Sequence, residues 1–122
     1  MAVQRLSFKE MCSTFDVTPR TLRYYEYIEL LQPEKEGRSR FYTSREIARM
    51  KLILRGRRFG FSLEEIRQWL EMRESEGTET QMAVWIEYAD RQLTELRKQR
   101  DELTKTIDDL QRLRDETVQS MK

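Results

Sequence analysis

Arginine and tyrosine are the side chains in this sequence whose spacing best suits binding chemistry. Arg20, Arg23, Tyr24 and Tyr27 recur at three- and four-residue intervals, which places two guanidinium groups and two phenols on one face of a helix. Guanidinium groups bind phosphates and guanine edges, and phenolic hydroxyls hydrogen-bond to phosphates. The pattern therefore predicts a surface that binds an anion or a nucleic acid.

The charge is distributed unevenly along the chain. Residues 1–72 carry 14 Lys and Arg against 10 Asp and Glu, and residues 73–122 carry 9 against 12. The segment from Arg38 to Arg58 alone has eight basic residues and one acid, Glu46. This local excess predicts an anion-binding surface. A solvated basic face is the alternative.

The sequence has few residues suited to catalysis or to metal binding. The chain has no histidine, which removes the commonest general base and metal ligand, and its single cysteine, Cys12, falls on the apolar stripe of a predicted helix. No phosphate-binding glycine loop or nucleophile motif is present. We predict a protein that is not an enzyme, with no catalytic residues, no metal and no cofactor.

The elements that position the basic residues can be located from capping patterns. Ser7 with Glu10 begins one helix, and Thr18 followed by Pro19 begins a second that runs to about Ile28. So short a connection between two short helices predicts a helix-turn-helix, whose second helix would enter the major groove. Residues 31–42 lose the helical period around Pro33 and Gly37 and predict a short β-hairpin, or wing.

Further capping pairs predict three more helices: Thr43 with Glu46, Ser62 with Glu65, and Thr78 with Gln81. The last helix has a seam spaced 4, 3, 4, 3 without a break, with Arg100, Arg114, Thr117 and Met121 in register with its apolar residues. This repeat predicts a coiled coil on the order of 60 Å long. A head of this size could not bury such a seam, so we expect a second copy to do so; the alternative is a helix folded back on its own head. The seam residues predicted to form the dimer are Met82, Ile86, Ala89, Leu93, Leu96, Leu103, Ile107 and Leu110.

The predicted fold is mainly α: a winged helix-turn-helix head with a β-hairpin wing in residues 1–72, a linker in 73–79, and a dimerisation helix in 80–122. No stretch approaches the roughly 20 apolar residues of a membrane helix, and Met1–Leu6 lacks the apolar core of a signal peptide. We therefore expect a cytoplasmic protein.

Three motifs together resemble the MerR family of transcriptional regulators. They are "TLRYYE" at residues 21–26, "RFYTSREIARM" at 40–50 and "FGFSLEEI" at 59–66. The region from Ala48 to Ile66 looks most similar to members that regulate branched-chain amino-acid and fatty-acid catabolism. The order of predicted elements matches the family over essentially the whole chain.

The resemblance implies roles for individual residues. Arg20 would face the major groove; Arg23, Tyr24 and Tyr42 would hold phosphates; Arg38 and Arg40 would lie on the wing; Arg57 or Arg58 would lie near a second, smaller wing. The complete set of predicted DNA contacts is Thr18, Arg20, Thr21, Arg23, Tyr24, Tyr27, Arg38, Arg40, Tyr42, Arg57 and Arg58.

The resemblance also implies a mode of action. Members form antiparallel coiled-coil homodimers, bind a promoter pseudo-palindrome of double-stranded DNA, and distort it so that RNA polymerase can use the promoter. An architectural or recombination-accessory protein with the same head is the alternative. The chain lacks the cysteines of metal-sensing members, so the resemblance identifies no effector.

Overall fold

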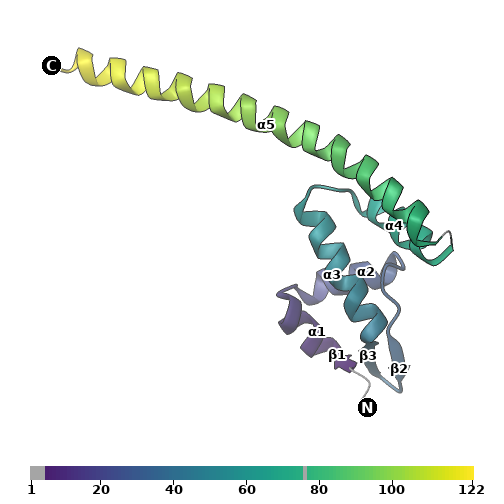
Figure 1. Cartoon of the computed structure of the whole chain (residues 1–122). Helices are drawn as coiled ribbons and strands as arrows, with labels where there is room; N and C mark the ends of the chain where they lie inside the picture. Colours follow the sequence, from purple (N-terminus) through teal and green to yellow (C-terminus); the bar gives the residue numbers. More distant parts are fainter. Residues whose placement is uncertain (1–4, 76) are drawn as a thin grey trace. The chain divides into compact units, whose positions relative to one another are not determined.

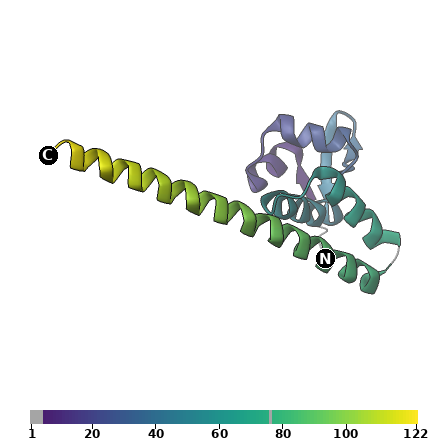
Figure 2. The same cartoon turned by 90° about the horizontal axis from the view of Figure 1, so that it is seen from above.

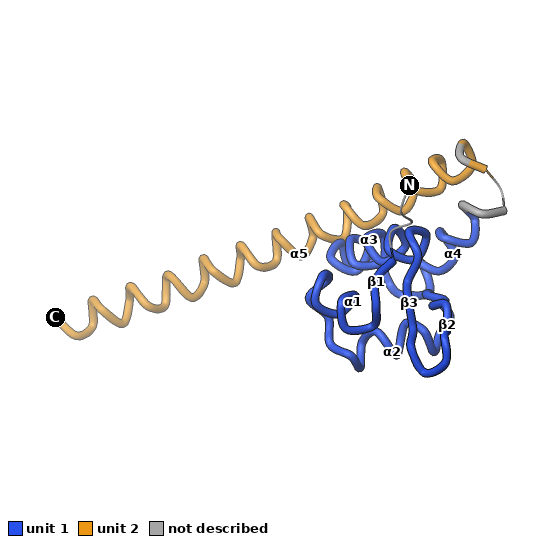
Figure 3. Tube along the Cα trace, turned by 90° about the horizontal axis from the view of Figure 1, so that it is seen from below, with its two compact units in different colours: residues 1–76 blue, residues 77–122 orange. Residues whose placement is uncertain are grey.

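The computed structural model describes residues 5–75 and 77–122 (Figure 1). The chain divides into two compact units, Met1–Glu76 and Gly77–Lys122 (Figure 3). Residues 1–4 of the predicted head and residue 76 of the predicted linker lie outside the described part. Unit 1 contains four helices and a small sheet among its described residues, and unit 2 is a single helix. Within the described residues, no helix is both long and apolar enough to cross a membrane.

The predicted helix-turn-helix is confirmed as α1 (Phe8–Phe15) and α2 (Pro19–Tyr27). Ser7 and Glu10 form a reciprocal capping box at the start of α1. At the start of α2, the Thr18 hydroxyl accepts the Thr21 amide at 3.1 Å, and Pro19 occupies the first helical position. Asp16 ends α1 in the left-handed region, with φ of 52°, which a short polar side chain tolerates better than most. The tight connection therefore follows from two caps and one left-handed residue.

The predicted wing is confirmed as a hairpin of β2 (Glu34–Glu36) and β3 (Ser39–Thr43). The chain reverses at Gly37, whose φ of +60° suits a residue without Cβ. Sequence reasoning missed a third strand, β1 (Arg5–Ser7), which pairs with the other side of β3 in an antiparallel sheet of order β1-β3-β2. This strand anchors the wing to the beginning of α1.

The next two helices are α3 (Ser44–Arg58) and α4 (Leu63–Ser75). The predicted capping box at Ser62 and Glu65 is present. The one predicted at Thr43 and Glu46 is wrong. The Glu46 carboxylate is buried and instead accepts the Gln32 amide at 3.0 Å and the Arg45 guanidinium at 2.5 Å. The bond from Gln32 holds the segment before the wing against the start of α3, so Glu46 stabilises tertiary structure instead of capping its own helix.

The core of the described chain is drawn from every helix of unit 1, from β3, and from the connections after α2 and α3. Cys12, predicted as core, is only half-buried, because Met11 takes the inward position on α1. The buried apolar side chains are Met11, Leu22, Tyr25, Leu30, Leu31, Tyr42, Ile47, Met50, Ile53, Phe61, Ile66 and Leu70.

Unit 2 is α5 (Thr78–Ser120), 43 residues long and unbroken in every view (Figure 2). Gly77 is its N-cap. The capping box predicted at Thr78 and Gln81 depends on the side chain of Thr78, which lies outside the described part of the chain. α4 runs to Ser75 and α5 begins at Thr78, within the stretch 73–79 that was predicted as a linker.

Candidate nucleic-acid interface

The exposed face of α2 carries the predicted basic and aromatic residues. Arg20 and Arg23 are exposed, and Tyr24 and Tyr27 are 50% and 82% exposed. The opposite face buries Leu22 and Tyr25 in the core, which fixes the rotation of the helix. Two guanidinium groups and two phenols are thus presented together to solvent from a helix with a defined orientation.

Thr18 and Thr21 lie at the beginning of the same helix, and both serve the cap. The Thr18 hydroxyl donates to the Thr21 hydroxyl oxygen at 3.0 Å while it accepts the Thr21 amide. Thr18 is exposed and Thr21 is half-buried. Either hydroxyl could therefore contact DNA only while it keeps the hydrogen bonds that cap α2.

The wing presents two further arginines. Arg38, in the turn between β2 and β3, is exposed. Arg40 on β3 is half-buried, and its Nη1 lies 3.5 Å from Oε1 of Glu26 on α2. The Glu26 carboxylate also accepts the hydroxyl hydrogen of Tyr42. One carboxylate of the second helix thus binds two side chains of the wing strand.

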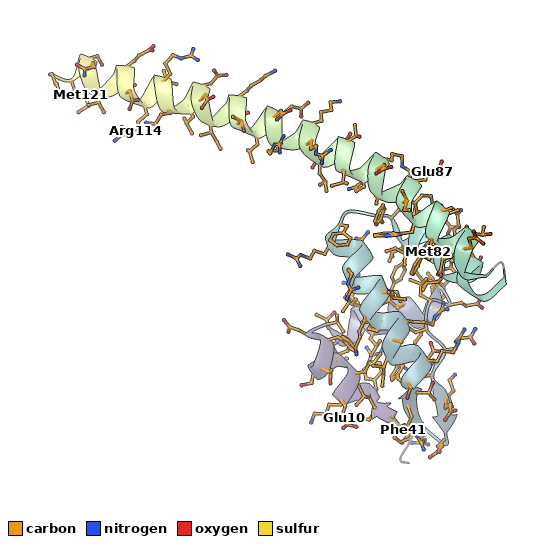
Figure 4. The ribbon with its side chains drawn as sticks, viewed as in Figure 1. Glu10, Phe41, Met82, Glu87, Arg114 and Met121 are labelled. Atoms are coloured by element: carbon orange, nitrogen blue, oxygen red, sulfur yellow. The ribbon has the colours of Figure 1, made fainter. Side chains whose placement is uncertain are left out.

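An open pocket of about 420 Å³ lies between α1, α2 and β3. Two phenylalanine rings and four basic side chains line it, together with two serines. The Arg23 and Arg40 guanidinium carbons lie 5.4 Å and 5.5 Å from the centroid of the Phe8 ring. Figure 4 labels Phe41 on β3 and Glu10 in the first turn of α1. These two elements and α2 surround the pocket.

The structure corrects the role expected for Tyr42. Its side chain is 0% exposed, and its hydroxyl is donated to Glu26. Burial, followed by the hydrogen bond to Glu26, raises the Tyr42 pKa far above its ordinary value. A buried hydroxyl already bonded to a carboxylate is not available to a phosphate in this structure, so we assign Tyr42 to positioning the wing.

Tyr42→Phe is expected to lower the free energy of unfolding by about 1.5–3 kcal/mol, since it removes a hydrogen bond to a charged group in a buried site. Urea unfolding at one fixed protein concentration measures the loss. Tyr27→Phe, at an 82% exposed position, is the matched control and should stay within about 0.5 kcal/mol of wild type. Equal stability of both variants would show that the hydroxyl of Tyr42 contributes nothing.

Urea unfolding of wild type and Tyr42→Phe at several pH values tests a second consequence of this hydrogen bond. Because the folded pKa of Tyr42 is raised, its contribution is fully present below the unfolded tyrosine pKa of about 10 and is lost as the pH rises above that value. The difference in stability between wild type and Tyr42→Phe should therefore shrink as the pH rises from about 10.

Arg57 and Arg58 occupy the last turn of α3 and are exposed. Arg57 donates from Nη1 to the Phe61 carbonyl oxygen at 3.3 Å. This bond ties the end of α3 to the turn before α4. Both charges remain accessible at this turn, where the resemblance expects a second, smaller wing.

The seam residues of α5 that were predicted to form a dimer are largely exposed. Leu103, Ile107 and Leu110 are about 60% exposed, and Ala89 is half-buried. Figure 4 labels Met82, Arg114 and Met121 along this helix. Leu113 and Val118 are exposed beside the seam and were not predicted. The seam remains exposed in the single chain. The other exposed predicted members are Met82, Ile86, Leu93 and Leu96.

Sequence reasoning also missed Phe8, Lys9 and Glu26. Phe8 and Lys9 were given no role, because the short strand β1, which pairs with β3 just before α1, has no periodic signal in the sequence. Glu26 stands within "TLRYYE", yet its function depends on Arg40 and Tyr42 of the wing. Among the residues that the structure describes, no three His, Cys, Asp or Glu side chains gather as a metal site would require.

Comparison with known proteins identifies the family. A family model described as "MerR HTH family regulatory protein" matches residues 6–73, and one described as "MerR, DNA binding" matches residues 47–113. The chain belongs to the MerR family. Together the two matches extend from β1 into α5, so membership concerns the head and most of the long helix.

Individual relatives agree with this assignment. The chain is 42% identical over 66 residues to the HTH-type transcriptional regulator ZntR of Escherichia coli K12, covering 52% of this chain and 47% of ZntR. It is 30% identical over 113 residues to the uncharacterized HTH-type transcriptional regulator PA4778 of Pseudomonas aeruginosa, covering 87% and 86%. The chain thus spans about half the length of ZntR.

A solved structure supports the fold. The crystal structure of a MerR-family transcriptional regulator from Bacillus cereus superimposes with a TM-score of 0.74 at 30% identity, covering 86% of this chain and 76% of that one. The predicted architecture, a mainly helical chain with a winged helix-turn-helix and a long C-terminal helix, is therefore confirmed.

Proposed function

We propose that this MerR-family chain is a sequence-specific DNA-binding transcription regulator of the cytoplasm, acts as a homodimer on a promoter pseudo-palindrome, and has no enzymatic activity. The observation that carries the proposal is the exposed face of α2. Arg20 and Arg23 make no ion pair with any described residue, and Tyr24 and Tyr27 extend the same face. Unpaired guanidinium groups on an oriented helix suit phosphates and base edges of a major groove.

The wing gives this face a second contact region. Arg38 and Arg40 lie on or beside β3, and Glu26 links that strand to α2. Phosphate contacts outside the major groove would fix the register of the head on the duplex, while Arg20 reads a base. We assign Arg57 and Arg58, at the end of α3, to a further stretch of backbone.

The exposed seam of α5 supports the homodimer. Burial of seven large apolar side chains per copy would drive association of two such helices. The two arginines of the seam indicate the relative direction. In a parallel, in-register pair, Arg100 and Arg114 would each face their own copy, and like charges inside a seam repel one another.

An antiparallel pair separates the two Arg114 side chains widely and moves the two Arg100 side chains into adjacent layers, so that neither arginine directly faces its own copy. When the two seams overlap over their full length from Met82 to Met121, Arg114 lies opposite the partner's Ala89, and Leu96 lies opposite the partner's Ile107. The smallest residue of the seam then accommodates the longest side chain. We therefore propose an antiparallel coiled coil in this register.

The promoter mechanism follows from membership of the family. A dimer that holds two winged heads at fixed spacing would bend or untwist a duplex whose half-sites do not match that spacing, and RNA polymerase would then use the reshaped promoter. An architectural role would require the same heads to act without a defined sequence.

Selection from a random pool of duplex DNA tests the proposal. The full-length protein is expected to enrich one motif with two-fold symmetry, and titrations at several salt concentrations should show a linear loss of log affinity with log salt. Arg23→Ala should weaken binding to every sequence alike and lower that slope by about one. Retention of DNA without an enriched motif would favour the architectural alternative, and failure to retain DNA would overturn the proposal.

A further inference from the structure

We infer that the pocket between α1, α2 and β3 is a phosphate-binding site, in which Phe8 and Lys9 of α1 act together with Arg23, Arg38 and Arg40. The inference rests on the proposed function, because the ligand to which it assigns the site is a phosphodiester of the DNA backbone. It goes beyond the contacts expected of the second helix and the wing, since it adds the first turn of α1 to the interface.

The charge of the pocket favours an anion. Lys9, Arg23, Arg38 and Arg40 all line it, and no acidic side chain does. Glu26 approaches Arg40 at 3.5 Å, while the other three cations form no ion pair with any residue in the described ranges. Four converging cations with a single carboxylate nearby leave a strong positive potential. Binding one phosphate would relieve their mutual repulsion.

Phe8 gives the pocket its geometry. Both the Arg23 and the Arg40 guanidinium groups lie within 6 Å of its ring centroid, at 5.4 Å and 5.5 Å, the range of a cation–π contact. The two guanidinium groups come from different elements, α2 and β3, and the ring restricts both. Phe8 is therefore a positioning residue that presents two cations to the same ligand.

Phe41 completes the apolar lining and is itself covered by Arg5. The Arg5 guanidinium carbon lies 3.8 Å from the Phe41 ring centroid, and Arg5 forms an ion pair with Glu36 at 2.6 Å. This arginine is committed to the sheet and takes no part in the site. Phe8 and Phe41 are thus the apolar part of a lining that is otherwise basic and hydroxylic.

The position of the pocket distinguishes it from a base-reading site. Arg20, the proposed base reader, is absent from its lining, whereas Arg38 at the wing turn is present. A pocket of about 420 Å³ admits a phosphate with its neighbouring sugar. The site would thus contact the backbone beside the groove that α2 occupies, and would contribute affinity without sequence preference.

Binding isotherms of full-length variants on the selected operator and on scrambled DNA test the site. Lys9→Ala is expected to weaken both about threefold to tenfold and to lower the salt slope by about one, because one fewer counterion is released. Phe8→Leu keeps every charge, so it should weaken both DNAs with an unchanged slope. Lys9→Arg should restore binding. Lys98→Ala, an exposed lysine of α5, is the matched control and should behave as wild type.

Calorimetric titration of inorganic pyrophosphate into DNA-free protein forms a second arm, with sulfate at equal ionic strength as comparator. Tighter binding of pyrophosphate to wild type than to Lys9→Ala supports the site and extends its ligands to free phosphate esters. A loss confined to the DNA arm supports the backbone phosphate alone. If Lys9→Ala and Phe8→Leu both match wild type in both arms, the inference is overturned.

Thermal melts of each variant show whether it is folded. If Phe8→Leu unfolds, Lys9→Ala still decides the test, because Lys9 is exposed and its replacement leaves the core intact. Failure of wild type to bind any DNA would instead overturn the proposed function, while the pyrophosphate arm would still decide whether the pocket binds phosphate.

Discussion

Leu103→Arg is expected to convert the dimer into monomers at micromolar concentration. The substitution introduces one charge per copy at the centre of the α5 seam, where the proposed register places it opposite the partner's Arg100. Burial of an uncompensated charge costs about 3–5 kcal/mol, which raises the dimer dissociation constant more than about 100-fold. Sedimentation equilibrium measures this change, and operator affinity should fall by about 10²–10⁴-fold because the two heads lose their tether.

The matched control places the same charge on the outer face of the helix. Gln119→Arg lies outside the seam and at an exposed position, so it should leave both the dimer and its operator affinity unchanged. A Leu103→Arg protein that sediments as a dimer with wild-type operator affinity would show that this seam does not join two copies.

Disulfide trapping tests the direction of the helices in a Cys12→Ser background. In the antiparallel register, Leu96→Cys combined with Ile107→Cys should yield an oxidised covalent dimer, while each single substitution should not, because only the pair brings Cα atoms within disulfide range. Covalent dimers from either single variant would indicate a parallel pair.

Arg20→Ala is expected to reduce the ratio of operator affinity to scrambled-DNA affinity by about 1–3 kcal/mol, or roughly 5- to 150-fold, with the loss concentrated at one base pair of each half-site. The reason is that an exposed guanidinium on the oriented face of α2 distinguishes guanine from other bases. Arg23→Ala is the comparison, since its proposed phosphate contact carries no sequence information.

Isotherms on the operator, on operators changed at single base pairs, and on scrambled DNA measure both effects. If Arg20→Ala lowered all affinities by the same factor, Arg20 would be a phosphate contact like Arg23, and base reading would have to come from another residue of α2.

Periodic features were predictable from the sequence because the physical signal is repeated. The seam of α5 repeats over many turns, and the Ser7 and Ser62 capping boxes each involve groups three residues apart. The exposed face of α2 was predictable for the same reason, since its arginines and tyrosines share one helical period.

Features that depend on distant partners were not predictable. Glu46 has the spacing of a capping residue relative to Thr43, yet it bonds to the Gln32 amide, which lies 14 residues earlier. Tyr42 was assigned to a phosphate because its position matches the family motif, and the structure buries it against Glu26, 16 residues away. The strand β1 was missed because three residues of pairing leave no pattern in the sequence. The pocket around Phe8 follows from that strand and was missed with it.

The shared carboxylate of Glu26 has a mechanical consequence for the proposed complex. Arg40 and Tyr42 are both fastened to α2 through it, so the wing cannot swing independently when the head meets a duplex of unsuitable shape. A head in which α2 and the wing are stiffly coupled deforms little under an imposed strain. The more compliant body takes up the deformation, and in such a complex that body is the DNA.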